Sequence, residues 1–429
     1  MRDLWFDRIE QAQAGIVRTN VTWHAIAGDE PPADRPIRQI RRPEVDDAGP
    51  SRPRCGRTWP LDVMFLFNTA PRWAEGDDRP SGTQPGSWKP DPIALGKFAQ
   101  AVATRYSGSY PDPLGGTLPQ VRYYEAWNEP NLDFWLAPQF SGGKNTGPEL
   151  YRDLHNALAE GVKSVDADNQ VIGPALAPFG GITGEKKTRT RPLKFMRDLF
   201  CLKGRKLKPT KCPGGERLII DIVSHHPLTT TGPPNQHAVN PDDATAGDMD
   251  KIRKTTRAAE KAGKLLPAGV RRPIWVSEFW YRSDPPSDEG VPLPKQARWV
   301  EQSLYIFWKQ GVKAAIYNLL RDKPNFNEEA AFGLYFRDGD AKPAAKAYRF
   351  PFVADRKSKR KLTIWGKSPA TGKVVVERQK GKKHKKWKRV KRFDAQAGRV
   401  FTGTVKLKGK QKLRASIKGE RSLTWTQRR

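Results

Sequence analysis

The feature that most constrains the fold is an alternation of short, β-branched and aromatic runs with longer stretches of helical periodicity. The strand candidates are residues 15–23, 61–67, 121–127, 170–173, 218–224, 274–277 and 312–318. The helix candidates are residues 2–13, 94–106, 147–165, 192–200, 248–261, 295–310 and 341–349. Strands that alternate with helices favour a parallel sheet covered by helices. We therefore predict an α/β fold, a (β/α)8 TIM barrel.

The pattern supplies seven strands, whereas a closed barrel needs eight. Because the chain opens on a helix at residues 2–13, we expect the missing strand to be the first, upstream of Met1. A truncated start would also remove a signal peptide, so its absence does not argue for the cytoplasm. Residues 33–60 are rich in Arg and Pro and lack a helical period. A long surface loop and a local reading-frame error would both give this pattern.

The net charge of +31 is unevenly distributed along the chain. Residues 355–429 hold 27 Lys and Arg against 4 Asp and Glu, which leaves a net charge of +8 for the residues before them. Short alternating segments follow in this part, at residues 361–365, 373–377, 387–390, 400–405 and 412–417. These patterns predict a barrel domain at residues 1–353 and a small antiparallel β-sandwich domain at residues 354–429.

The charge of the second domain predicts attraction to a polyanion such as an acidic glycan or an anionic envelope. The basic hairpin at residues 380–386 is either a solvated turn or such an anchor. The sequence has no nucleic-acid-binding motif and no apolar run near the ~20 residues of a membrane span. It also lacks a zinc-spaced Cys/His set and a glycine-rich phosphate loop. We therefore expect no specific nucleic acid, no transmembrane segment, no metal and no cofactor.

Three cysteines occur in the chain. Cys201 and Cys212 flank a short basic loop and either close a disulfide, if the protein is exported, or remain reduced. Cys55 is left over.

Two glutamates stand where predicted strands end, Glu129 after residues 121–127 and Glu278 after residues 274–277. Taken singly, each fits a solvated edge charge or an ion pair. Both have aromatic neighbours, which suit sugar rings, and an apolar surround raises a carboxyl pKa. Two carboxylates at the carboxyl ends of barrel strands predict paired-carboxylate chemistry, of which glycosidic bond cleavage is the commonest kind.

The segment Trp127-Asn128-Glu129-Pro130 resembles the Asn-Glu-Pro motif that follows strand four in the retaining glycoside hydrolases of clan A. The resemblance is to the cellulase-like and xylosidase-like enzymes near families 5 and 39, and it covers about residues 10–350. The segment around Glu278 resembles the strand that carries their nucleophile. The resemblance implies that Glu129 is the acid/base, that Glu278 is the nucleophile and that Asn128 binds the sugar 2-hydroxyl.

The resemblance extends to Arg18, similar to the arginine that keeps the nucleophile ionised, although a barrel-floor ion pair fits it as well. His225 or His226 would line the site, or sit in the core. Tyr317 stands where these enzymes often have a tryptophan, and Leu228 stands where they often have a tyrosine. The remaining candidates are Trp73, Trp135 and Trp280. Each of them either stacks on a sugar ring or belongs to the core.

We expect a monomeric, retaining O-glycosyl hydrolase that acts on a polysaccharide or oligosaccharide outside the cell or in its envelope. The alternatives are a non-catalytic carbohydrate-binding barrel and a polyanion-binding protein.

Overall fold

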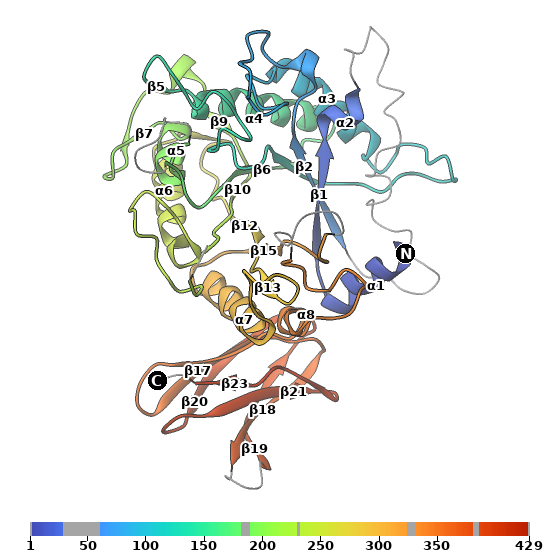
Figure 1. The fold of residues 1–429 in the computed structure, drawn as a ribbon, viewed down its shortest axis with the longest axis vertical. Helices are drawn as coiled ribbons and strands as arrows, with labels where there is room; N and C mark the ends of the chain where they lie inside the picture. Colours follow the sequence, from blue (N-terminus) through green and yellow to red (C-terminus); the bar gives the residue numbers. More distant parts are fainter. Residues whose placement is uncertain are drawn as a thin grey trace.

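The computed structural model describes residues 2–28, 61–181, 189–229, 232–323, 331–380 and 386–427. Its centre is a parallel sheet of seven strands that follow one another in chain order (Figure 1). These strands are β1 (Ile16–Thr22), β2 (Asp62–Asn68), β3 (Tyr123–Ala126), β6 (Gln170–Leu176), β10 (Ile222–His225), β12 (Ile274–Phe279) and β15 (Ala314–Tyr317). The predicted parallel α/β architecture is confirmed.

The sheet curves into a nearly closed, TIM-like barrel. In the described residues β1 and β15 end the sheet and no hydrogen-bonded ladder joins them, although Cα atoms of the two strands approach within 8 Å. The helices are α1 (Arg2–Ala12), α2 (Trp23–Ala27), α3 (Pro92–Arg105), α4 (Gly147–Lys163), α5 (Pro192–Leu199), α6 (Met249–Lys261), α7 (Leu293–Lys309) and α8 (Pro343–Arg349). Three single turns are η1 (Arg72–Ala74), η2 (Pro213–Gly215) and η3 (Ala246–Asp248).

Local sequence explains where these helices begin. Proline stands in the first turn of α3, α4, α5, α7 and α8, where its missing N–H costs nothing. The side chain of Asp91 caps α3 by accepting from the backbone N–H groups of Ile93 and Ala94. Helical apolar stripes such as Leu95, Phe98 and Val102 then pack into the main core.

The predicted strand at residues 218–224 is divided into two. β9 (Leu218–Ile219) pairs with β11 (Leu265–Leu266) in a separate small sheet, and β10 alone joins the barrel. Asp221 lies at the division, and its carboxylate accepts from the backbone N–H of Val171 (2.8 Å) and pairs with Lys163 (2.9 Å). The other short strands are β4 (Phe140–Ser141), β5 (Lys144–Asn145), β7 (Leu202–Lys203), β8 (Lys208–Pro209), β13 (Ser283–Asp284) and β14 (Val291–Pro292).

The inside of the barrel is arranged in layers. An apolar plug fills its lower part, made of Met64, Ile172, Ile222, Trp275 and Ile316, with Ile16 and Tyr123 packed against it. Side chains alternate between the two faces of a strand, so residues two positions farther on also point inward. Five of these seven next residues are polar, namely Arg18, Glu125, Ser224, Ser277 and Asn318, and the other two are Leu66 and Pro174. A mainly polar layer therefore lies on the plug, towards the carboxyl ends of the strands.

The C-terminal part consists of two antiparallel sheets. The first contains β16 (Phe352–Arg356), β17 (Lys361–Lys367) and β20 (Val400–Lys406). The second contains β18 (Gly372–Lys380), β19 (Lys386–Ala395), β21 (Lys412–Ile417), β22 (Glu420–Arg421) and β23 (Trp425–Thr426). Both sheets contribute to one apolar core, which Tyr305 of α7 also joins. The predicted antiparallel strands are thus present, and their core is continuous with a barrel helix.

Cys201 and Cys212 form a disulfide, which is one of the two alternatives left open by the sequence. Cys55, residues 33–60 and residues 381–385 lie outside the described residues. Across the described ranges, none of the helices has the length and apolar character that a membrane crossing requires.

We expect the double substitution Cys201→Ser/Cys212→Ser to lower the free energy of unfolding. Closing a loop of 11 residues restricts the unfolded chain, and losing this constraint costs roughly 3 kcal/mol. Guanidinium unfolding followed by tryptophan fluorescence would measure the change. Non-reducing mass spectrometry of the unsubstituted chain should find the Cys201 and Cys212 peptides linked. Unlinked peptides, together with equal stability of the double variant and the unsubstituted chain, would contradict the disulfide.

Candidate active site

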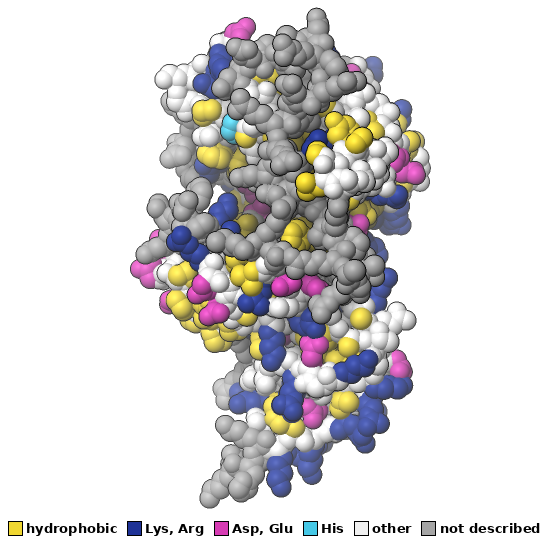
Figure 2. Space-filling view, turned by 90° about the vertical axis from the view of Figure 1, so that its right-hand side faces the viewer, with side chains coloured by type: hydrophobic (Ala, Val, Ile, Leu, Met, Phe, Trp, Pro, Cys, Tyr) yellow, Lys and Arg dark blue, Asp and Glu magenta, His cyan; other side chains and the backbone are white. Residues whose placement is uncertain are grey.

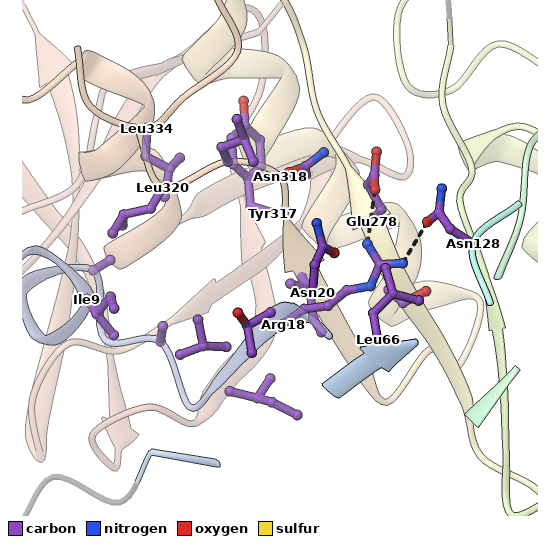
Figure 3. Close-up of a pocket in the computed structure, with 18 of the residues that line it drawn as sticks. Ile9, Arg18, Asn20, Leu66, Asn128, Glu278, Tyr317, Asn318, Leu320 and Leu334 are labelled. Atoms are coloured by element: carbon purple, nitrogen blue, oxygen red, sulfur yellow. Dashed lines mark hydrogen bonds and ion pairs between the residues drawn. The ribbon is translucent and has the colours of Figure 1, made fainter. Parts of the chain in front are cut away.

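A cavity of about 530 Å³ opens on the polar layer of the barrel (Figure 3). Six of the residues singled out from the sequence line it: Arg18, Asn128, Glu129, Trp135, Glu278 and Tyr317. The cavity continues between β1 and β15 to the apolar side chains of Ile9, Leu320 and Leu334. The two glutamates, 149 positions apart in the chain, therefore face the same space.

Arg18 lies at the bottom of this cavity and binds three groups. Its Nε donates to Oε2 of Glu125 (2.7 Å), one terminal nitrogen donates to Oε2 of Glu278 (3.2 Å), and the other donates to Oδ1 of Asn128 (2.9 Å). Burial acts to lower the pKa of Arg18, but the negative charges of Glu125 and Glu278 outweigh burial and raise it. The guanidinium thus stays charged and links the strands that carry the site.

Glu278, near the end of β12, is held as a carboxylate. Its Oε1 accepts from the indole Nε1 of Trp280 (3.2 Å), while Arg18 binds Oε2. Burial acts to raise the pKa of Glu278. The charges of His226 and Arg18, together with hydrogen bonds from Asn318 and Trp280, outweigh burial and lower this pKa below its ordinary value of 4.5.

The loop after β3 turns Asn128 and Glu129 into the cavity together. Trp127 has φ 61° and Glu129 has φ 41°, left-handed values that side-chain-bearing residues rarely adopt. Such a residue costs about 1–3 kcal/mol, so its surroundings must enforce it. Two contacts do so here. The Trp127 indole donates to the carbonyl of Trp135 (2.7 Å), and the Glu129 backbone N–H donates to the carbonyl of Ala175 (3.1 Å).

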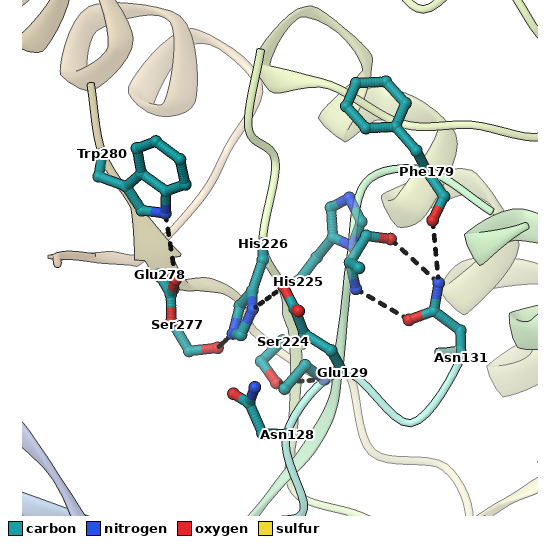
Figure 4. A network of polar contacts seen from close by, with 12 residues as sticks. Asn128, Glu129, Asn131, Phe179, Ser224, His225, His226, Ser277, Glu278 and Trp280 are labelled. Carbon is teal, nitrogen blue, oxygen red and sulfur yellow. Dashed lines mark hydrogen bonds and ion pairs between the residues drawn. The ribbon is translucent and has the colours of Figure 1, made fainter. Parts of the chain in front are cut away.

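Asn131 fixes this loop from behind (Figure 4). Its Oδ1 accepts from the backbone N–H of Ala177 (2.9 Å), and its Nδ2 donates to the carbonyl of Thr190 (3.0 Å) and more weakly to that of Phe179 (3.4 Å). The side chain is fully buried. It therefore ties the loop that carries Glu129 to the chain that leaves β6.

The two adjacent histidines face different surroundings. His226 is fully buried and forms hydrogen bonds with Oε1 of Glu129 (3.0 Å) and with the hydroxyl of Ser277 (3.1 Å), so it stands between the two glutamate-bearing segments (Figure 4). His225 instead donates to the carbonyl of Ala244 (2.8 Å). Neither histidine is part of the cavity lining, and His226 reaches the site only through Glu129 and Ser277. Burial lowers the pKa of His225 to about 4.

The aromatic candidates are also divided. Trp135 and Tyr317 line the cavity, and Tyr317 packs edge-on against Phe279 at 5.1 Å between ring centres. Trp280 binds Glu278 and stacks on Phe332 (4.5 Å), although it is not part of the lining. Trp73 packs against Trp23 (5.9 Å) at the main core, away from the cavity.

Several residues of the site were missed in the sequence. They are Glu125, Asn20, Asn68, Ser277 and Asn318. Glu125 had a recognisable signal, because it is a charged residue inside a short aromatic strand. The amides had none, because Asn20, Asn68 and Asn318 are single uncharged polar residues in or directly after strands. Among the described residues, no group of three or more His, Cys, Asp or Glu is placed to hold a metal ion.

No family model matches the chain, and no curated protein sequence matches it. Solved structures do. A glucosidase from Croceicoccus marinus is 14% identical, with a TM-score of 0.46 over 94% of this chain and 89% of that one. A calcium-binding mutant of Bacteroides uniformis β-glucuronidase 2 is 10% identical, with a TM-score of 0.45 over 100% of this chain and 42% of that one. A Cellulomonas fimi endo-β-1,4-mannanase double mutant is 13% identical, with a TM-score of 0.36 over 86% and 77%.

The chain thus spans less than half of the β-glucuronidase and most of the other two proteins. All three names describe glycoside hydrolases. With TM-scores below 0.5, these similarities carry no argument about activity. The case for a function depends on the side chains of the site.

We expect Arg18→Met to destabilise the protein by about 3–5 kcal/mol, because it leaves the fully buried Glu125 without its counter-charge. It should also raise the pKa of Glu278, since one of the charges that lowers it is gone. Chemical unfolding and a ¹³C NMR titration of labelled glutamate would measure the two effects. The double variant Arg18→Met/Glu125→Leu is the control and should regain part of the stability. An unchanged stability in Arg18→Met would refute the central role of this ion pair.

Proposed function

We propose that this protein is a retaining O-glycosyl hydrolase of the clan A type, near families 5 and 39, acting on a polysaccharide or oligosaccharide. One observation carries the proposal. Glu129 and Glu278 line one cavity but have different partners: Arg18 and Trp280 bind Glu278, whereas His226 binds Glu129. Paired carboxylates in unlike environments are the requirement for acid and nucleophile roles.

In the first step Glu278 attacks the anomeric carbon. Its lowered pKa keeps it ionised, and Arg18, Trp280 and Asn318 orient its two oxygens. Glu129 donates its proton to the glycosidic oxygen as the bond to the leaving group breaks. The result is a glycosyl ester on Glu278, a free leaving group and a Glu129 carboxylate.

In the second step Glu129 acts as a base. It takes a proton from water, the water oxygen attacks the anomeric carbon, and the bond to Glu278 breaks. Two inversions restore the original configuration. His226, held by Ser277, orients the Glu129 carboxyl for both steps.

Carboxamides around the cavity suit sugar hydroxyls. Arg18 donates to Oδ1 of Asn128, so the Nδ2 of Asn128 is left to donate to the substrate. Asn20 is exposed at the cavity, and Asn68 lines it from the next strand. Trp135 supplies an aromatic wall, a common partner for the C–H face of a sugar. These groups favour a neutral sugar ring next to the two carboxylates.

The Cys201–Cys212 disulfide supports a location outside the cell or in its envelope, because disulfides persist in oxidising compartments. We further propose that residues 1–353 are the catalytic domain of a monomer and residues 354–429 an accessory β-sandwich.

A second candidate function is a non-catalytic carbohydrate-binding barrel. It is favoured by the unpaired ends of the described sheet, β1 and β15, which border the cavity. A site bordered by two unpaired strands is held less rigidly than a site in a closed barrel. Such a site would bind a sugar without stabilising the transition state.

The substitutions Glu278→Gln and Glu129→Gln separate the two functions and the two roles. We expect Glu278→Gln to abolish turnover of all aryl glycosides. Glu129→Gln should lose turnover of substrates with poor leaving groups but keep much of it with 2,4-dinitrophenyl glycosides, which need no protonation. Azide should rescue this variant and give a glycosyl azide of retained configuration. The matched control Glu149→Gln, at an exposed residue of α4, should still turn over. If the unsubstituted chain and Glu278→Gln both bind sugar without turnover, the second function is correct.

The pH profile tests the ionised state of Glu278. A carboxylate whose pKa is lowered below 4.5 in the folded protein is more than half ionised at pH 4.5 and loses its charge as the pH falls further. The acid limb of kcat/KM should therefore lie below pH 4.5. In Trp280→Phe, which lacks one donor to Glu278, this limb should move to higher pH. Initial rates on an aryl glycoside in buffers of constant ionic strength would show this, and an acid limb well above pH 5 would count against the nucleophile.

A further inference from the structure

The second C-terminal sheet has one face in the core and one facing outward. Val374, Val376, Leu413, Ala415 and Ile417 point into the apolar core. The residues that alternate with them therefore lie on the opposite face. Figure 2 shows dark-blue Lys and Arg side chains gathered over the lower part of the molecule, where these sheets lie in Figure 1.

The pairing register places arginines from different strands in rows across this outer face. Arg389 of β19 lies opposite Glu377 of β18, which lies opposite Arg414 of β21. In the next row Arg392 lies opposite Val375, and that row continues through Ser416 to Arg421 of β22. Lys412 lies two residues from Arg414 and so shares its face. We call Arg389, Arg392, Lys412, Arg414 and Arg421 the basic face.

A β-bulge creates this arrangement. Arg389 and Arg392 are three residues apart, so a regular strand would place them on opposite faces. The register shifts between Val376 and Glu377, and the extra residue in β19 brings both arginines to the outer face.

Four of the five charges of the basic face are unneutralised, and the fifth, Arg414, is held in place. Arg414 is held from two sides, by Oε2 of Glu377 (2.8 Å) and by the ring of Trp387 (4.0 Å). The side chains of Arg389, Arg392, Lys412 and Arg421 are exposed, and within the described ranges no acidic group pairs with them. By the spacing of paired strands, Arg389 and Arg414 lie about 10 Å apart, Arg392 and Arg421 about 14 Å apart, and Lys412 and Arg414 about 7 Å apart along one strand. Such rows of cations fit a linear chain with repeated anionic groups.

We propose that the basic face binds an acidic polysaccharide. Charge complementarity supports such a partner, and guanidinium groups bind carboxylates and sulfates with paired hydrogen bonds. The Arg414 guanidinium covers the Trp387 ring, so this sheet does not offer the open aromatic platform on which single-stranded nucleic acids stack. The face lies on residues remote from Glu129 and Glu278 and does not depend on the chemistry of the barrel.

Affinity electrophoresis of the full chain in gels containing polygalacturonate would test the proposal. Neutral dextran and a short DNA duplex serve as comparisons. The variant Arg389→Glu/Arg392→Glu should bind polygalacturonate about tenfold more weakly, because two contacts become repulsive. The matched control Lys357→Glu/Lys359→Glu makes the same change in net charge on exposed residues of the turn between β16 and β17. It should change the affinity less than about twofold.

The variant Arg389→Gln/Arg392→Gln repeats the measurement without repulsion, and circular dichroism confirms that each variant is folded. Turnover of an aryl glycoside, if the barrel is active, should be the same in all of them. Equal losses in the two Glu variants would show attraction by net charge alone and overturn the proposal. Tighter binding to the DNA duplex than to polygalacturonate, at equal ionic strength, would replace it with a nucleic-acid partner.

Discussion

The buried guanidinium of Arg18 organises the barrel mouth. It bonds to Glu125 of β3, to Asn128 of the loop that follows β3, and to Glu278 of β12. A buried charge is tolerated only when partners satisfy it, and the planar fork of arginine can satisfy several at fixed angles. Each of these partners is therefore held in one orientation by the same group. The lowered pKa of Glu278 is one consequence of this arrangement.

The layered interior makes such a buried ion cluster possible. Apolar side chains such as Met64, Ile172 and Trp275 form the plug, and Arg18 and Glu125 lie above it. The plug supplies packing energy and gives the polar layer a rigid base. The polar layer in turn faces the loops, where the strained turn at Trp127 and Glu129 is enforced by contacts with Ala175 and Trp135. The residues that stabilise the barrel and the residues of the candidate site therefore lie at successive positions along the same strands.

Sequence patterns were sufficient for the strands and for the order in which they pair, because period-2 and period-3.6 patterns are local properties. They failed at residues 218–224, which form two short strands in different sheets, β9 beside β11 and β10 in the barrel. They also left open which of the two histidines belongs to the site. His226 alternates with Ile222 and Ser224 and binds Glu129, whereas His225 points the other way and bonds to Ala244. Which of the two alternating faces points inward was decided by the closure of the sheet.

The sequence by itself determined the alternation of strands and helices, the positions of two glutamates at strand ends and the excess of positive charge after residue 354. These are properties of neighbours in the chain, and they need no knowledge of what the chain touches. Only the tertiary structure decided that Arg18 joins Glu125 to Glu278, and that a bulge turns Arg389 and Arg392 to one face. Both depend on register and on contacts between distant segments, because the burial that fixes a charge exists only once those segments have met.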